Sequence, residues 1–342
     1  TLEHVIPRWA QSRYNLWDQT ISLLNGTEIR YRNLRIPCCD KCNNQFLEPI
    51  ENDVLEAVKG GINSFRELSE ETIFYWLGKI YFGLMYKEMF LAADQQNTDN
   101  GTIITSGYIK TFKTHYMFLQ GIRRLHKFKS FFPASIYVFE TQIPSNIEDQ
   151  WDFMDNHLSM FIACRLGPIG LISVLQDGGI TKQLENLLDD YSKLPLHPLQ
   201  FRELAAKIFY KSTLINRTPK YISHEANGIV ETIQLPIMGL SNRPVFDDWD
   251  NDEYARDALK RLGCMILDND DILGIISEHA ESKISDYALI MSKLLETLEE
   301  VEKRSQLEII EDLFSINTDI IRIILKDSTN GTILFEDCTR LM

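Results

Sequence analysis

The sequence predicts an α+β fold that is rich in helices, with a small N-terminal module before a larger, mixed and mostly helical region. Three observations support this fold class. Asn25-Gly26 separates two alternating segments, which is a hairpin signal. Apolar residues recur at helical spacing over residues 71–91. β-branched and aromatic residues gather again in residues 134–143, which indicates a return to strands.

The first sixty residues contain two predicted strands and one predicted helix. Residues 20–24 and 28–36 alternate between apolar and polar side chains, as half-buried strands do. A Cys-x-x-Cys turn follows, and then a helix from about residue 46 to residue 59. Gly60-Gly61 is the first plausible boundary, because paired glycines interrupt regular structure.

Helices and strands alternate in the middle of the chain. A Gln-, Asn-, Asp- and Gly-rich loop at residues 95–101 ends the first long helix. The elements expected after this loop are a helix near 107–128, strands at 134–143, 158–166 and 169–175, a helix at 199–215 and a strand at 228–235. Gly167-Pro168 lies between the second and third of these strands, as in a hairpin.

The C-terminal part is expected to be acidic and helical. Residues 241–253 are rich in Ser, Asn, Pro and acidic side chains, which predicts a surface loop or linker. Two long helices are expected over about 284–303 and 305–326. The predicted domains are 1–60, 61–240 and 241–342.

Composition excludes several classes of protein. No apolar run reaches the roughly 18 to 20 residues that a membrane span needs, and no signal-peptide pattern opens the chain. Six cysteines in 342 residues are too few for a disulfide scaffold. We therefore expect a cytoplasmic protein with no membrane partner. Because the chain begins at Thr1, we also expect the N-terminal module to be truncated.

The net charge of −14 is unevenly distributed. Residues 1–60 carry −1, residues 61–140 carry +2 and residues 141–342 carry −15. A protein that is acidic overall captures nucleic acid slowly, yet clustered basic groups still bind phosphates, so DNA remains an expected partner. The acidic C-terminal helices are best explained as solvated faces. They could also mimic DNA, or contact a protein partner or a second copy of the chain.

Two short segments carry residue types suited to phosphodiester hydrolysis. They are Leu2-Glu3-His4-Val5-Ile6-Pro7 and Cys39-Asp40-Lys41-Cys42-Asn43-Asn44. The reaction needs a base that deprotonates water, a divalent cation and oxygen ligands that hold the cation. A histidine beside a carboxylate, facing an amide oxygen on a nearby helix, supplies all three. Mg²⁺ prefers oxygen ligands and keeps several waters, so two protein ligands can suffice.

This layout resembles the HNH (ββα-metal) endonuclease family over about residues 1–52. The family motif runs Asp/Glu-His-x-x-Pro, an intervening Asn, and then Cys-x-x-Cys followed by His or Asn. The resemblance implies that His4 is the general base and that Asn33 orients the loop behind it. It implies that Glu3 and Asn43 bind Mg²⁺ or Mn²⁺. Asn at the third position is also similar to the HNH domain of the RNA-guided CRISPR nucleases, which cut DNA.

Two features depart from the family pattern. Asn33 stands six residues before Cys39, one more than the family spacing. Many relatives also carry a second Cys-x-x-Cys before the Glu-His pair, so that four thiolates hold a structural Zn²⁺. With Cys39 and Cys42 alone, a tetrahedral zinc ion would be half-liganded. A structural zinc site is therefore expected only if a further pair precedes Glu3, and otherwise the two cysteines are reduced thiols.

A basic segment lies between residues 100 and 139, which contain no acidic residue before position 140. Its basic residues are Lys110, Lys113, Arg123, Arg124, Lys127 and Lys129. Aromatic residues are interleaved with them: Tyr108, Phe112, Tyr116, Phe118 and Phe128. A basic helix with aromatic residues can follow a phosphate backbone. The alternative is an amphipathic helix whose aromatic side chains belong to the core.

The leading expectation is a metal-dependent HNH endonuclease that hydrolyses DNA. By analogy with other HNH domains joined to larger domains, it would be an effector of a prokaryotic anti-phage defence or mobile-element system. One alternative is a latent nuclease, gated by a partner or a nucleotide signal that the C-terminal region senses. Another is a catalytically silent nucleic-acid-binding module, which the intact Glu3, His4 and Asn43 argue against. No Gly-rich phosphate loop supports ATP-driven action.

Overall fold

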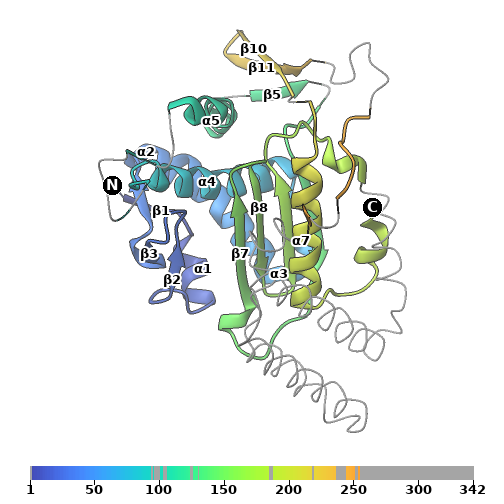
Figure 1. The fold of residues 1–342 in the computed structure, drawn as a ribbon. Helices are drawn as coiled ribbons and strands as arrows, with labels where there is room; N and C mark the ends of the chain where they lie inside the picture. The colour runs from blue at the N-terminus through green and yellow to red at the C-terminus, as the bar shows by residue number, and fades with distance from the viewer. Residues whose placement is uncertain are drawn as a thin grey trace. The chain divides into compact units, whose positions relative to one another are not determined.

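The computed structural model describes residues 2–93, 95, 101–102, 106–123, 126–129, 131–184, 188–217, 219–235, 244–250 and 253–254. The chain forms two compact units. The first comprises Thr1–Glu185 and Pro195–Asp248, and the second comprises Asn186–Leu194 and Trp249–Met342. The fold is α+β, as predicted, and Figure 1 shows helices and several small sheets. The two long C-terminal helices expected over 284–303 and 305–326 lie outside the described residues.

Two short strand pairs organise the N-terminus. The elements in chain order are β1 (Leu2–His4), α1 (Arg8–Arg13), β2 (Thr20–Ser22), β3 (Glu28–Arg30) and β4 (Arg35–Pro37). β2 and β3 form the hairpin predicted from Asn25-Gly26, in which Gly26 has a φ of +76°. β1 pairs antiparallel with β4, which places His4 opposite Arg35.

The single strand predicted over 28–36 is wrong. A 3₁₀ turn, η1 (Tyr31–Asn33), divides it into β3 and β4, which pair with different partners. Tyr31 is buried in this turn, and its hydroxyl accepts a hydrogen bond from Trp151 Nε1 at 3.3 Å. Local alternation could not reveal the break, because Trp151 lies 120 residues away.

A long helical segment follows β4. It consists of α2 (Asp40–Cys42), the π-helical turn η2 (Asn43–Leu47) and α3 (Glu48–Arg66). The helix predicted over 46–59 is therefore confirmed but extends beyond both limits. Gly60 and Gly61 lie inside α3, and Gly61 kinks the helix with a φ of +80° instead of ending it.

The central helix is α4 (Glu70–Glu88), which confirms the apolar stripe predicted over 71–91. Ser69 caps its start, because its hydroxyl accepts a hydrogen bond from Thr72 N at 3.1 Å. Nearly every residue from Ile73 to Met85 is buried, on all sides of the helix. A helix buried all round belongs to the middle of a core. No helix in the described part of the chain is long and apolar enough to cross a membrane.

The helix predicted over 107–128 ends early. It comprises α5 (Ser106–Leu119), and after the 3₁₀ turn η4 (Gln120–Ile122) the chain forms strand β5 (His126–Lys129). β5 pairs in parallel with β11 (Ile229–Gln234), a hundred residues further along the chain. β11 confirms the strand predicted over 228–235. Its hairpin partner β10 (Tyr221–Ala226) was not predicted, although Asn227-Gly228 between the two strands is a hairpin signal.

A four-stranded antiparallel sheet also belongs to the first unit. The order of its strands is β6–β9–β8–β7. Its strands are β6 (Ser135–Glu140), β7 (Trp151–Asn156), β8 (Phe161–Leu166) and β9 (Ile169–Val174). The hairpin at Gly167-Pro168 is confirmed, whereas β7 was not predicted. The helix predicted over 199–215 is confirmed as α7 (Pro198–Thr213). α7 covers one face of the four-stranded sheet, and α3 lies behind the other face (Figure 1).

A buried polar network joins the end of α4 to this sheet. His157 Nε2 lies 2.6 Å from Glu88 Oε2, and His157 Nδ1 lies 3.0 Å from the Tyr81 hydroxyl. Glu88 also accepts a hydrogen bond from Leu24 N, at the hairpin of β2 and β3. Asp155 Oδ2 is 3.8 Å from His157 Nε2. Burial raises the pKa of Asp155 to about 6; the nearby His157 opposes the shift.

We predict that Asp155→Asn stabilises the protein more at neutral pH than at pH 4. The raised pKa means that folded Asp155 holds a proton that the unfolded chain, with a pKa of 3.8, has already lost. The parent therefore loses up to about 3 kcal/mol of stability from this group as pH rises from 4 to 7, which Asn avoids. Urea denaturation across this pH range measures the difference. For Asp53→Asn, an exposed control, the change in stability relative to the parent should not vary with pH. The same pH-independent change for Asp155→Asn would contradict the prediction.

Candidate functional site

β1 lies against the central helix α4 in matched register. Glu3 and Val5 are two residues apart, so they point to the same side of the strand. Lys79 and Gly83 are four residues apart, so they lie on one face of α4. Glu3 Oε1 accepts a hydrogen bond from Lys79 Nζ at 2.7 Å, and a Cβ added at Gly83 would meet Val5 Cγ2 at 2.8 Å. Two strand residues span about 6.6 Å and four helix residues about 6.0 Å. The two spacings are similar, so Glu3 can face Lys79 while Val5 faces Gly83.

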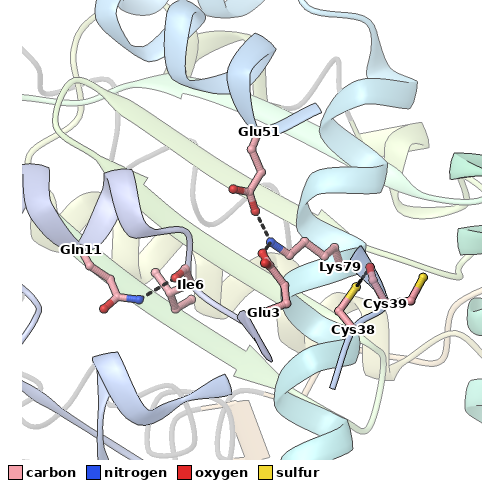
Figure 2. A network of polar contacts seen from close by, with 7 residues as sticks. All are labelled: Glu3, Ile6, Gln11, Cys38, Cys39, Glu51 and Lys79. Atoms are coloured by element: carbon pink, nitrogen blue, oxygen red, sulfur yellow. Dashed lines mark hydrogen bonds and ion pairs between the residues drawn. The ribbon is translucent and has the colours of Figure 1, made fainter. Parts of the chain in front are cut away.

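Backbone hydrogen bonds fix the chain just after β1. Val5 N donates to Leu34 O at 3.0 Å, which continues the pairing with β4. The Gln11 side-chain amide donates to Ile6 O at 2.7 Å, so the turn into α1 is tied to that helix (Figure 2). Gln11 and Ile6 are both fully buried. The Glu3-His4 pair is therefore held on a short but well-anchored strand.

Glu3 takes part in a buried three-residue ion-pair network (Figure 2). Lys79, from α4, donates to Glu3 and also to Glu51 of α3. The side chains are 7%, 12% and 19% exposed for Lys79, Glu3 and Glu51 respectively. Burial raises the pKa of Glu51, with Lys79 opposing and Glu3 adding to the shift. Burial acts to lower the pKa of Lys79, but the negative charges of Glu51 and Glu3 outweigh this effect, so the pKa is raised. Lys79 is therefore a charged ammonium at every physiological pH.

His4 leaves β1 on the other side of the strand, as alternation requires. It is 5% exposed, and its ring lies 5.8 Å from the ring of Trp17. Its Nδ1 is buried without a hydrogen-bond partner among the described residues. Burial lowers the pKa of His4, and the nearby Arg8 lowers it further, while Glu3 opposes the shift. The imidazole is therefore neutral at pH 7 and able to accept a proton.

The Cys-x-x-Cys turn starts the long helical segment beside β4. Cys39 caps it, because its Sγ accepts a hydrogen bond from Cys42 N at 3.2 Å, and Asn43 N donates to Cys39 O at 2.9 Å. The Cys38 thiol donates to Cys39 O at 3.6 Å. Burial, then Cys42 and Glu3, raise the pKa of Cys38. The charges of Cys42 and Glu3 thus both act on the Cys38 thiol.

The oxygen ligands implied by the family resemblance fit the chemistry of Mg²⁺, but they lie on different elements. Glu3 is on β1, and the half-buried Asn43 begins η2. Within the described part of the chain, no hydrogen bond joins the Asn43 side chain to Glu3 or His4. Asn33 is exposed in η1, two residues before Arg35, which pairs with His4.

A structural zinc ion does not fit the described residues by themselves. Cys39 and Cys42 contact each other, and the hydrogen bond from Cys42 is the main cause that lowers the pKa of Cys39. No three His, Cys, Asp or Glu side chains in the described ranges form a group that could hold a metal ion. The two thiols therefore remain two ligands of the four that zinc takes.

The basic segment lies partly on the surface next to the Cys-x-x-Cys turn. Its exposed members are Lys113, Arg123, Lys127 and Lys129, whereas the side chains of Lys110 and Arg124 lie outside the described residues. The hydrogen bond between the two thiols lowers the pKa of Cys39 and raises that of Cys42; the positive charge of Arg123 adds to the first shift and opposes the second, so it acts on the turn. Of the interleaved aromatic residues, Phe112 and Phe118 are buried in the core and Tyr116 is exposed.

Lys79 and Glu51 are the residues near the motif that sequence reasoning missed. A signal for Lys79 was present, because a lysine stood among the apolar residues of the predicted helix over 71–91. Lysine is almost never fully buried unless it is paired, so a lysine inside an all-apolar helix indicates a buried acidic partner. Nothing in the sequence identified that partner as Glu51.

Comparisons with protein-family models, curated proteins and solved structures gave no match to this chain.

We predict that Gly83→Ala destabilises the protein, although alanine favours helices over glycine by about 1 kcal/mol. The added methyl would meet Val5 at 2.8 Å, and Val5 is fully buried against α4. Overpacking of this kind typically costs about 1–3 kcal/mol. Urea denaturation followed by tryptophan fluorescence measures the change. Lys87→Ala, one turn later on α4, is the control and should alter stability by less than about 0.5 kcal/mol. Stabilisation by Gly83→Ala would show that β1 does not depend on this contact.

Proposed function

We propose that the chain is a metal-dependent endonuclease of the HNH type that hydrolyses DNA phosphodiester bonds. The observation that carries the proposal is the order of elements around the motif. The Glu3-His4 strand pairs antiparallel with β4, and the Cys39-x-x-Cys42-Asn43 turn follows β4 directly and leads into a long helix. With α1, β2 and β3 inserted between the two paired strands, this order is compatible with the ββα arrangement that the family resemblance implies.

His4 is the group that takes a proton from the attacking water. The water oxygen forms a bond to phosphorus as the bond to the leaving oxygen breaks, and the imidazole accepts the proton that the water loses. A neutral imidazole is required for this step, and burial together with Arg8 lowers the pKa of His4.

Glu3 and Asn43 are the residues that would hold the cation. Both provide oxygen donors, which Mg²⁺ and Mn²⁺ prefer. When bound, such an ion stabilises the negative charge that develops on the phosphate and the leaving oxygen. The roles of the three residues are thus divided: His4 moves a proton, and Glu3 and Asn43 bind.

The exposed basic residues of the segment around β5 support DNA as the substrate. The charge of Arg123 acts on the thiols of the Cys-x-x-Cys turn, and Lys127 and Lys129 follow on β5. Lys129 pairs with Glu231 at 2.9 Å, so Arg123 and Lys127 are the stronger candidates for phosphate contact. Their charge would offset locally the acidity of the whole chain.

A latent form of the same nuclease is the second candidate, and one observation favours it. His4 is almost fully buried. A site whose base is covered needs a rearrangement before it can act. Gating by a partner or a nucleotide signal would suit an effector of a prokaryotic defence or mobile-element system.

We predict that His4→Ala lowers plasmid cleavage in Mg²⁺ by roughly 10²- to 10⁴-fold while DNA affinity stays near that of the parent. Glu3→Gln and Asn43→Ala should instead raise the Mg²⁺ concentration needed for half-maximal cleavage, because they remove cation ligands. Rates on plasmid, linear duplex and single-stranded DNA, measured against Mg²⁺ concentration, test these effects. His224→Ala, at an exposed histidine on β10, is the matched control. A His4→Ala variant that cuts as fast as the parent would sink the proposal.

We predict that Arg123→Glu combined with Lys127→Glu weakens DNA binding and flattens its salt dependence. Each lost phosphate contact reduces the number of counterions that binding releases. Fluorescence anisotropy with a labelled duplex, over a series of salt concentrations, measures both quantities. Lys59→Glu combined with Lys87→Glu changes the net charge equally but lies on α3 and α4. Equal loss in both double variants would mean that only the net charge matters.

A further inference from the structure

We propose that Lys79 and Glu51 position the Glu3 carboxylate and fix β1 against the helical segment that begins at Asn43. This inference rests on the proposed function, because it assigns supporting residues to the metal ligand Glu3. Neither Lys79 nor Glu51 belongs to the motif that carries the family resemblance. Both act through Glu3 and are therefore positioning residues.

The first support is the fixed place of the Lys79 ammonium. A lysine side chain has several rotatable bonds, so it holds a neighbour in place only when its own end is restrained. Lys79 is 7% exposed, and its Nζ donates to one carboxylate on β1 and to one on α3. The buried ammonium could not move away without losing these acceptors, which is costly. Figure 2 shows Lys79 extending from α4 to both carboxylates.

The second support is the set of elements that the network joins. Glu3 is on β1, and Glu51 is on α3, in the helical segment that starts with the Cys-x-x-Cys turn. The two elements thus meet at Lys79 of α4, a helix that the motif does not include. The contact of Val5 with Gly83 holds the next residue pair in the same register. Side-chain and backbone packing therefore restrain β1 at two successive points.

The third support is the way Lys79 binds Glu3. Its hydrogen bond goes to Oε1, so one oxygen of the carboxylate is restrained. Carboxylates that bind metals are usually held by such outer-sphere hydrogen bonds, which orient them toward the ion.

The test uses the full-length protein, with Mn²⁺ as the probe. Mn²⁺ affinity is measured by electron paramagnetic resonance, and DNA cleavage is measured in parallel, both at a temperature where thermal melting shows each variant folded. Lys79→Met should lower affinity or the cleavage rate by roughly 10- to 100-fold. Lys79→Arg, which can still donate to both carboxylates, should retain more of both. Lys207→Met is the matched control, because Lys207 is a buried lysine paired with Glu203 on α7.

Each outcome bears on the proposal. If the parent neither binds Mn²⁺ nor cuts DNA, the proposed function fails and this inference fails with it. If the parent does both and Lys79→Met matches it, the positioning role alone is wrong. Tighter Mn²⁺ binding by Lys79→Met would also overturn it, because Lys79 would then compete with the cation. If Lys79→Met does not fold, Glu51→Gln decides: a loss at an unchanged melting temperature supports the role, and parent-like values contradict it.

Discussion

The arrangement of the N-terminus depends on the ammonium of Lys79, which is buried between the carboxylates of Glu3 and Glu51. Removing one partner of a buried ion pair leaves an uncompensated charge, which typically costs about 3–5 kcal/mol. That is a large share of the roughly 5–15 kcal/mol by which a domain is stable. The network therefore strongly constrains how β1, α3 and α4 pack together.

The same constraint separates the two residues that begin the motif. Because side chains alternate along a strand, Glu3 faces α4 while His4 faces Trp17. The charge of Glu3 still influences the pKa of His4, so the two groups remain near each other. The strand therefore presents the two residues to different neighbours: Glu3 to the Lys79 ammonium and His4 to the Trp17 ring.

Much of what could be predicted from the sequence rests on local signals. Asn25-Gly26 identified the first hairpin, Gly167-Pro168 identified the second, and the apolar stripe identified α4. These succeed because turn chemistry and helical periodicity act between residues a few positions apart. The candidate site residues Glu3, His4 and Asn43 came from their spacing and the family resemblance, and their roles remain predictions.

The sequence by itself determined the α+β class, the main helices and the position of the motif, because residues close in the chain decide these features. Only the tertiary structure decided that residues 126–129 form a strand, since β5 depends on β11 a hundred residues away. It also decided that Lys79 pairs with Glu3 and Glu51, which are 76 and 28 positions from it. A buried charge requires a partner, but the chain's folding in space chooses which residue it is.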